Sequence, residues 1–181
     1  MRNLSLFVVL TLAACGSSSP EPAPAPDPAP AAAPEPTPAP APAPAAEAVN
    51  AVTIEGDVAV IALEGNDQMQ FNTKEIVVPA GKKVRLTLTH TGKLAAAAMG
   101  HNFVLLKAGT DGQAFSNAAA TARDSGYIPE AMKGDVIAHT KVVGGGEADT
   151  IEFDAPPAGE YPFLCSFTGH YALMNGVFKV Q

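Results

Sequence analysis

Basic side chains, cysteines and long apolar runs are all scarce in this sequence of 181 residues. Lys and Arg total 11 against 18 Asp and Glu residues, which gives a formal net charge of −7 at pH 7. Nucleic acids and anionic surfaces attract proteins of the opposite sign, so this composition predicts neither as a partner. A basic or apolar partner surface is compatible with it.

The apolar runs are too short to span a bilayer, which takes about 20 predominantly apolar residues. One of them, Leu4 to Leu12, follows the cation Arg2 and indicates a cleaved export signal at residues 1–14. The sequence Leu12-Ala13-Ala14-Cys15 is similar to a bacterial lipobox, so we expect Cys15 to carry a lipid that anchors the protein. The alternative is an ordinary signal peptide cut nearby.

The stretch after the cysteine has the composition of a tether. Residues 15–47 contain Gly16-Ser17-Ser18-Ser19 and then almost only Pro and Ala up to Ala46. Frequent proline favours extended polyproline II, at about 3.1 Å per residue, so the spacer could reach roughly 80 Å. A ligand for proline-binding modules is the alternative, but the repeat lacks flanking basic residues. Gly16 instead of aspartate favours outer-membrane anchoring, with the remaining domain in the periplasm or at the surface.

Residues 48–181 are the right size for one domain and have the pattern of a small all-β protein. Gly, Pro, Asn and Asp separate short apolar or alternating segments, which predicts a β-sandwich rather than alternating strands and helices. The alanine-rich stretch Gln113–Arg123 predicts one short inserted helix. The expected strands are Val58–Leu63, Met69–Asn72, Glu75–Val78, Val84–Thr89, Phe103–Lys107, Val136–Val143, Thr150–Phe153, Glu160–Leu164 and Gly176–Val180.

The cysteine count leaves one thiol in this domain. If Cys15 carries the lipid, Cys165 cannot form an internal disulfide. A lone cysteine in an oxidising compartment is a liability unless it is buried or bound, and a metal thiolate accounts for it.

Cys165, His170 and Met174 lie within ten residues, on an expected loop between two strands. Blue-copper centres use two imidazoles and a thiolate with a weak axial thioether, so these residues supply three of four ligands. His90, His101 and His139 are the candidates for the second imidazole. We favour His101, because Gly100 before it allows a backbone carbonyl to approach a metal closely. Each residue alone would more often be a core or surface residue.

The spacing of these residues, with Met99-Gly100-His101-Asn102, resembles that of the azurins, which are type 1 blue copper proteins of the cupredoxin family. The runs Glu64–Thr73 and Val136–Lys141 also resemble azurins, and the similarity covers Val58 to Gln181. The Pro- and Ala-rich N-terminal segment resembles that of the lipid-modified azurins of Gram-negative outer membranes. The resemblance implies a Greek-key cupredoxin sandwich.

The resemblance also assigns roles to individual residues. It implies one copper ion, alternating between Cu(I) and Cu(II), and it places Asn102 and Phe167 beside the ligands. His90 is expected to be buried near the site and His139 to be exposed. The implied ligands are His101, Cys165 and His170, with Met174 axial and the Gly100 carbonyl as a second weak axial contact.

Three departures from the azurin pattern stand out. The usual disulfide between the first and third strands is missing, which should cost roughly 2–4 kcal/mol of stability unless packing compensates. Phe103 occupies the place of a core tryptophan, and the chain contains no tryptophan. Thr168 stands where a proline is usual in the ligand loop, which predicts an altered reduction potential.

The resemblance implies a monomeric electron carrier rather than an enzyme. Its expected partners are respiratory redox proteins, such as c-type cytochromes or a copper or haem reductase, which would dock on an apolar patch around His170. Two other functions are compatible with the same fold: copper sequestration or delivery by a lipoprotein, and binding of other envelope or host partners. The expected patch consists of Leu94, Ala98, Met99, Phe167, Gly169 and Ala172.

Overall fold

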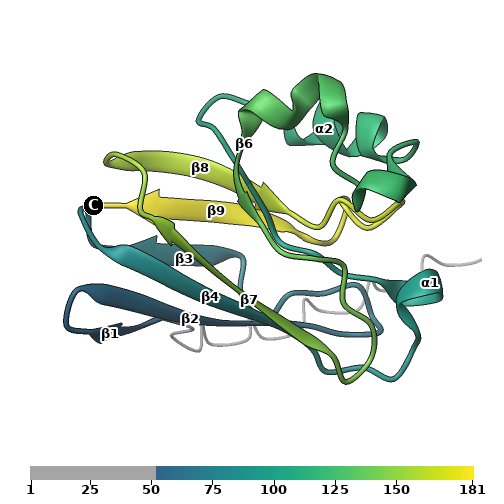
Figure 1. The fold of residues 1–181 in the computed structure, drawn as a ribbon, viewed down its shortest axis with the longest axis horizontal. Coiled ribbons are helices and arrows are strands. Elements are labelled where there is room, and N and C mark those ends of the chain that lie inside the picture. Colours follow the sequence, from purple (N-terminus) through teal and green to yellow (C-terminus); the bar gives the residue numbers. More distant parts are fainter. Residues whose placement is uncertain (1–51) are drawn as a thin grey trace, which may run out of the picture. The chain divides into compact units, whose positions relative to one another are not determined.

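Strands with one apolar face form two β-sheets that pack against each other (Figure 1). The computed structural model describes residues 52–181, so the predicted signal, lipid anchor and tether all lie outside the described residues. The first sheet has the order β1 (Val52–Glu55), β2 (Val58–Gly65), β4 (Lys83–His90) and β7 (Ala148–Asp154). The second has the order β3 (Glu75–Val78), β9 (Asn175–Val180), β8 (Gly159–Leu164), β5 (Val104–Leu106) and β6 (Val136–His139).

The chain crosses between the sheets early. Strand β3 leaves the first sheet to pair in parallel with β9, and β4 then returns to pair in parallel with β2. Strand β4 alternates in polarity, so one of its faces points into the core. Val84, Leu86 and Leu88 on that face are fully buried, while the residues between them are less buried. The two-sheet architecture confirms the predicted all-β sandwich.

The helices differ from the prediction of one helix over 113–123. Helix α2 spans Gly112–Ala119, and its first turn is capped by the Asp111 carboxylate, which accepts from the amides of Gln113 and Ala114. It ends early because the Ala122 amide bonds to the Ala119 carbonyl and begins a tighter turn. Three further short helices within residues 52–181 are α1 (Ala96–Met99), η1 (Arg123–Ser125) and η2 (Glu130–Asp135).

One strand prediction was wrong, one was too long, and one strand was missed. Residues 69–72 form no regular strand. A turn at residues 66–69 precedes them, because the Asn66 side chain accepts from the amides of Gln68 and Gln70 and Met69 adopts a left-handed φ of 56°, and Phe71 makes only an isolated bridge to Gly65. The segment predicted as one strand over 136–143 is regular only as β6, and the rest of it contacts the His101 loop through Val143. The short, largely exposed strand β1 was not predicted.

Aromatic rings fill the centre of the sandwich. Phe103 is fully buried and its ring centroid lies 5.5 Å from that of Phe163, so a phenylalanine occupies the core position expected of tryptophan. Strands β2 and β4 end together at Gly65 and His90, and β8 ends opposite the start of β9. The loops beyond these strand ends carry the candidate site. Within residues 52–181, no helix has the length and apolar character needed to cross a membrane.

Candidate metal centre

The predicted ligands come from two loops at one end of the sandwich. Cys165 directly follows β8, and its amide donates to the carbonyl of Met174, 2.9 Å away, just before β9. Between them the Met174 amide donates to the His170 carbonyl, which folds the loop into a tight turn. His101 is attached to the adjacent chain by reciprocal backbone hydrogen bonds with Val143.

The side chains of His101, Cys165 and His170 converge on one point. Their donor atoms all lie within 4.8 Å of one another. The two Nδ1 atoms are 3.2 Å apart, and Cys165 Sγ lies 4.0 Å from His101 Nδ1 and 3.7 Å from His170 Nδ1. Bonds of about 2.0 Å to nitrogen and 2.3 Å to sulfur in a trigonal plane would separate these pairs by roughly 3.5 and 3.7 Å. The arrangement therefore fits a type 1 copper site.

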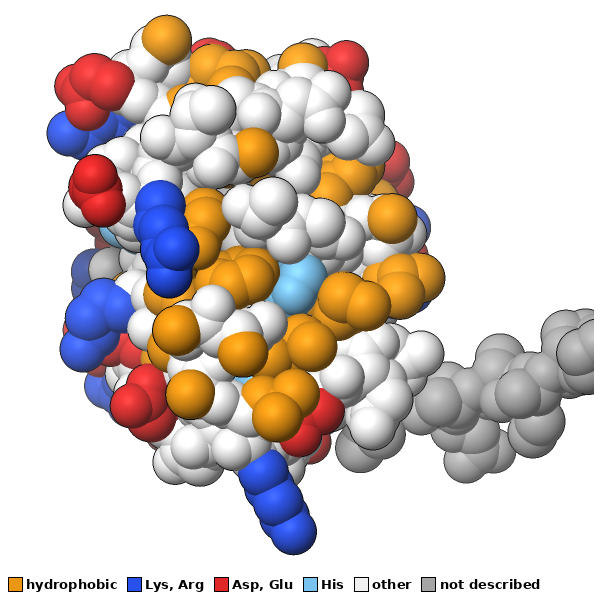
Figure 2. Space-filling view, turned by 90° about the vertical axis from the view of Figure 1, so that its right-hand side faces the viewer, with side chains coloured by type: hydrophobic (Ala, Val, Ile, Leu, Met, Phe, Trp, Pro, Cys, Tyr) orange, Lys and Arg blue, Asp and Glu red, His pale blue; other side chains and the backbone are white. Residues whose placement is uncertain are grey.

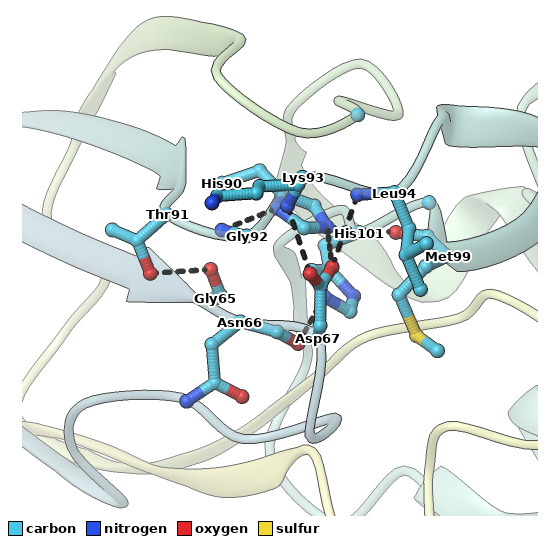
Figure 3. A network of polar contacts seen from close by, with 12 residues as sticks. Gly65, Asn66, Asp67, His90, Thr91, Gly92, Lys93, Leu94, Met99 and His101 are labelled. Carbon is cyan, nitrogen blue, oxygen red and sulfur yellow. Dashed lines mark hydrogen bonds and ion pairs between the residues drawn. The ribbon is translucent and has the colours of Figure 1, made fainter.

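The orientation of His101 is set by a backbone carbonyl. Its Nε2 donates to the carbonyl of Asn66 at 2.9 Å (Figure 3). The lone pair of Nδ1 therefore faces Cys165 and His170. Such a hydrogen bond fixes the tautomer and the ring plane of a metal-binding histidine. His101 therefore has the correct nitrogen free before any metal arrives.

Met174 and Gly100 border the same space. Met174 is fully buried, and a Cβ added to Gly65 would lie 2.8 Å from His101 Cδ2 and 3.4 Å from Met174 Cε. The thioether side chain and the imidazole thus both pack over the same glycine. The Gly100 carbonyl oxygen lies 4.0 Å from Cys165 Sγ.

Burial controls the protonation of the three donors. It raises the pKa of the Cys165 thiol to about 11, although the backbone N–H groups of Asn102 and Phe167 partly oppose this by stabilising the thiolate. Burial also lowers the pKa of His101. Burial, together with the nearby imidazole of His101, lowers the pKa of His170 to about 4. Both imidazoles are therefore neutral at pH 7, and a metal would bind them directly while displacing the thiol proton.

Asn102 joins the two ligand loops. Its side-chain oxygen accepts from the Ser166 amide and its Nδ2 donates to Ser166 Oγ, both at 2.8 Å. These bonds are buried and connect the residue after His101 to the residue after Cys165. The relative position of imidazole and thiolate is thus fixed by one side chain.

The two other candidate histidines have different surroundings. His90 is fully buried: its Nε2 donates to the Met99 carbonyl and its Nδ1 accepts from the Gly92 amide, so both nitrogens are already used. His139 is exposed and donates from Nδ1 to the Thr140 carbonyl. The structure therefore brings His101, and neither of the others, to Cys165 and His170.

Sequence reasoning missed the role of Asp67. Its carboxylate accepts from the amides of Lys93 and Leu94, and these hydrogen bonds, that of Lys93 above all, lower its pKa (Figure 3). The bonds hold the loop after His90 against the loop that carries Asn66. An adjacent Asn-Asp pair in the run Glu64–Thr73 was the available signal, because both side chains readily cap backbone amides.

Hydrophobic side chains surround a histidine edge at this end of the molecule (Figure 2). Within the predicted patch Leu94 is 45% exposed, whereas Phe167 is buried and only 3% of His170 is exposed. Leu173, which was not predicted, is 46% exposed in the ligand loop. Ala98, Gly169 and Ala172 are exposed and Met99 is half-buried. Thr168 is exposed in the same turn, and the amides that stabilise the thiolate belong to Asn102 and Phe167.

A two-sheet sandwich with His, Cys, His and Met gathered at one end defines a cupredoxin with a type 1 copper site. Residues 58–181 match the family described as copper binding proteins, plastocyanin/azurin family. The chain belongs to this plastocyanin/azurin family.

Individual relatives agree with this assignment. Azurin of Alcaligenes faecalis is 43% identical over 124 residues, covering 66% of this chain and 96% of that protein. Outer membrane protein H.8 of Neisseria meningitidis serogroup B is 46% identical over 118 residues, covering 63% of each. The solved structure of azurin Az-iso2 from Methylomonas sp. strain J has a TM-score of 0.60 and 29% identity, covering 67% of this chain and 97% of that one.

Proposed function

We propose that this protein is a membrane-tethered type 1 copper protein that carries single electrons between redox partners in the cell envelope. The observation that carries the proposal is the buried group of His101, Cys165 and His170, whose donor atoms lie within 4.8 Å of one another. Copper bound there supplies a one-electron couple between Cu(I) and Cu(II). These three side chains would hold the ion, and Met174 and the Gly100 carbonyl would contribute weaker contacts.

The protein's contribution is to keep the donor set fixed. Asn66 orients His101, Asn102 ties the two loops, and the Cys165 amide is bonded to Met174. Soft and intermediate ligands in such a set suit both oxidation states. Donors that are already placed need little movement when an electron enters or leaves, which favours a carrier over an enzyme.

Exchange with partners would occur through the apolar patch around His170. The exposed side chains of Leu94 and Leu173 offer a partner apolar contact area that needs no ion pairs. Small interfaces of this kind suit brief docking, which a carrier needs in order to release each partner quickly. The expected partners are respiratory redox proteins such as c-type cytochromes or a copper or haem reductase.

The tether belongs to the proposal as well. Residues 1–14 would be removed, Cys15 would carry the lipid, and residues 16–47 would hold the copper domain away from the membrane. Support comes from the lipobox-like sequence and from the similarity to a protein named as an outer membrane protein. Palmitate labelling with membrane fractionation tests this part, and a Cys15→Ser variant should lose the label.

Copper loading tests the central claim. The protein reconstituted with Cu(II) should show an intense visible thiolate-to-copper absorption and rapid electron self-exchange. Cys165→Ser should lose that absorption, whereas Ser166→Ala, beside it in the loop, should keep it. A colourless product, or a blue one that exchanges electrons slowly, would rule out the carrier function.

A further inference from the structure

A groove of about 380 Å³ lies beside the apolar patch, between the α1 region and the chain around His139. Its floor is apolar and includes Tyr127, Val142 and Phe167. Two of its lining residues, Arg123 and Lys141, carry a positive charge, and His139 also lines it. No lining residue is acidic, although the whole chain carries a net charge of −7.

The basic side chains of the groove are accessible. Arg123 is exposed, and among residues 52–181 it forms no ion pair. Lys141 is exposed and contacts Asp149 at 3.2 Å, outside the groove lining. Figure 2 shows Lys and Arg side chains, with Asp and Glu side chains among them, along one side of the hydrophobic surface at this end of the molecule. The groove lining thus carries two cationic side chains and no carboxylate, although Asp149 pairs with Lys141 from outside the lining.

The floor of the groove leads to the metal ligands. The ring centroid of Tyr127 lies 4.8 Å from that of Phe167, and the ring of Phe167 lies 4.7 Å from that of His170. The backbone N–H of Phe167 also stabilises the Cys165 thiolate. A molecule seated in the groove would therefore lie over aromatic rings that contact a ligand of the metal.

We propose that this groove is a docking site for surface carboxylates of an acidic redox partner. The inference rests on the proposed electron-carrier function and adds a charge preference to it. Arg123 and Lys141 would attract carboxylates beside the partner's exposed cofactor edge, while the apolar patch makes the contact itself. Complementary charges of this kind mainly raise the association rate, and their effect falls with ionic strength.

Rates with a c-type cytochrome of net negative charge test the proposal. In the full-length copper-loaded protein, the double variant Arg123→Glu, Lys141→Gln should react about tenfold more slowly near 10 mM ionic strength, and salt should reduce the difference. The matched control is Lys82→Gln, Lys83→Glu, which makes the same change in charge. Lys83 begins β4 and lies about 23 Å along the strand from His90, so this control should change the rate less than twofold.

A second readout does not depend on electron transfer. The acidic cytochrome should move amide NMR signals of Ala97 and Val142 in the reduced protein, and the groove variant should lose these shifts. Equal slowing by both double variants, or shifts confined to the apolar patch, would overturn the proposal. Groove signals that move when Glu21, Asp27, Glu35 and Glu47 are replaced by Gln in the free protein would also overturn it, because the acidic tether would then be the occupant.

The electron self-exchange rate distinguishes failure of the docking site from failure of the proposed electron-carrier function. Under the proposed function, two copies would exchange electrons through the apolar patch, so the groove variant should retain the blue absorption and the self-exchange rate. Retained self-exchange without any groove effect contradicts the docking site alone. Loss of colour and self-exchange in the unmodified protein contradicts the carrier function itself.

Discussion

The imidazole of His90 stacks on that of His101, with ring centroids 4.4 Å apart and planes inclined by 15°. His90 also connects the turn at Gly92 to the Met99 carbonyl next to Gly100. It therefore supports the metal-binding imidazole from behind without facing the metal. Strands β2 and β4 end side by side at Gly65 and His90, so pairing with β2 helps to hold His90 in this position.

Replacing His90 by Leu should destabilise the protein but leave the blue absorption in place. The change leaves the Met99 carbonyl and the Gly92 amide without partners, which costs roughly 1–3 kcal/mol when such groups are buried. Urea unfolding of the metal-free protein measures the loss. His139→Leu is the control, since that side chain is exposed and should shift the midpoint little. Disappearance of the colour in His90→Leu would mean that His90 is itself a ligand.

Gly65→Ala should disturb the site directly. The new Cβ would lie 2.8 Å from His101 Cδ2, closer than such atoms approach, so the imidazole must shift. We expect a loss of roughly 1–3 kcal/mol in stability, typical of overpacking, and a changed visible spectrum after copper loading. Gly134→Ala is the matched control, because nothing lies within 4 Å of its added Cβ. Identical spectra for both variants would contradict the position assigned to His101.

The alternation in β4 and the ligand spacing after β8 were enough to predict the sandwich and one ligand loop, because both are local patterns. The choice of His101 over His90 and His139 rested on the glycine before it and agreed with the resemblance, although all three histidines lie in or next to expected strands. The turn at Met69 was missed because it depends on hydrogen bonds of the Asn66 side chain rather than on hydrophobicity. Asp67 was missed because its partners are backbone amides 26 and 27 residues away.

Asn102→Ala should weaken the connection between the two ligand loops. It leaves the buried Ser166 amide without its acceptor, at a cost of roughly 1–3 kcal/mol, and it frees the Cys165 loop from the His101 loop. We expect lower thermal stability and a shifted reduction potential. Ser166→Ala keeps the amide-to-Asn102 bond, so it should have the smaller effect on both. Equal effects of the two substitutions would show that the Asn102 side chain does not set the loop geometry.

The metal-free protein should lose stability as the pH falls from about 6.5 to 4. Burial lowers the pKa of His170 to about 4, whereas an unfolded chain titrates this residue near 6.5. Between these values the unfolded state binds more protons, so acid favours unfolding, by roughly 2–3 kcal/mol from His170 alone. Urea midpoints at pH 7 and pH 4.5 measure the change, and His170→Gln should show a smaller one than His139→Gln. An equal pH dependence of the two variants would mean that His170 is not held neutral by the fold.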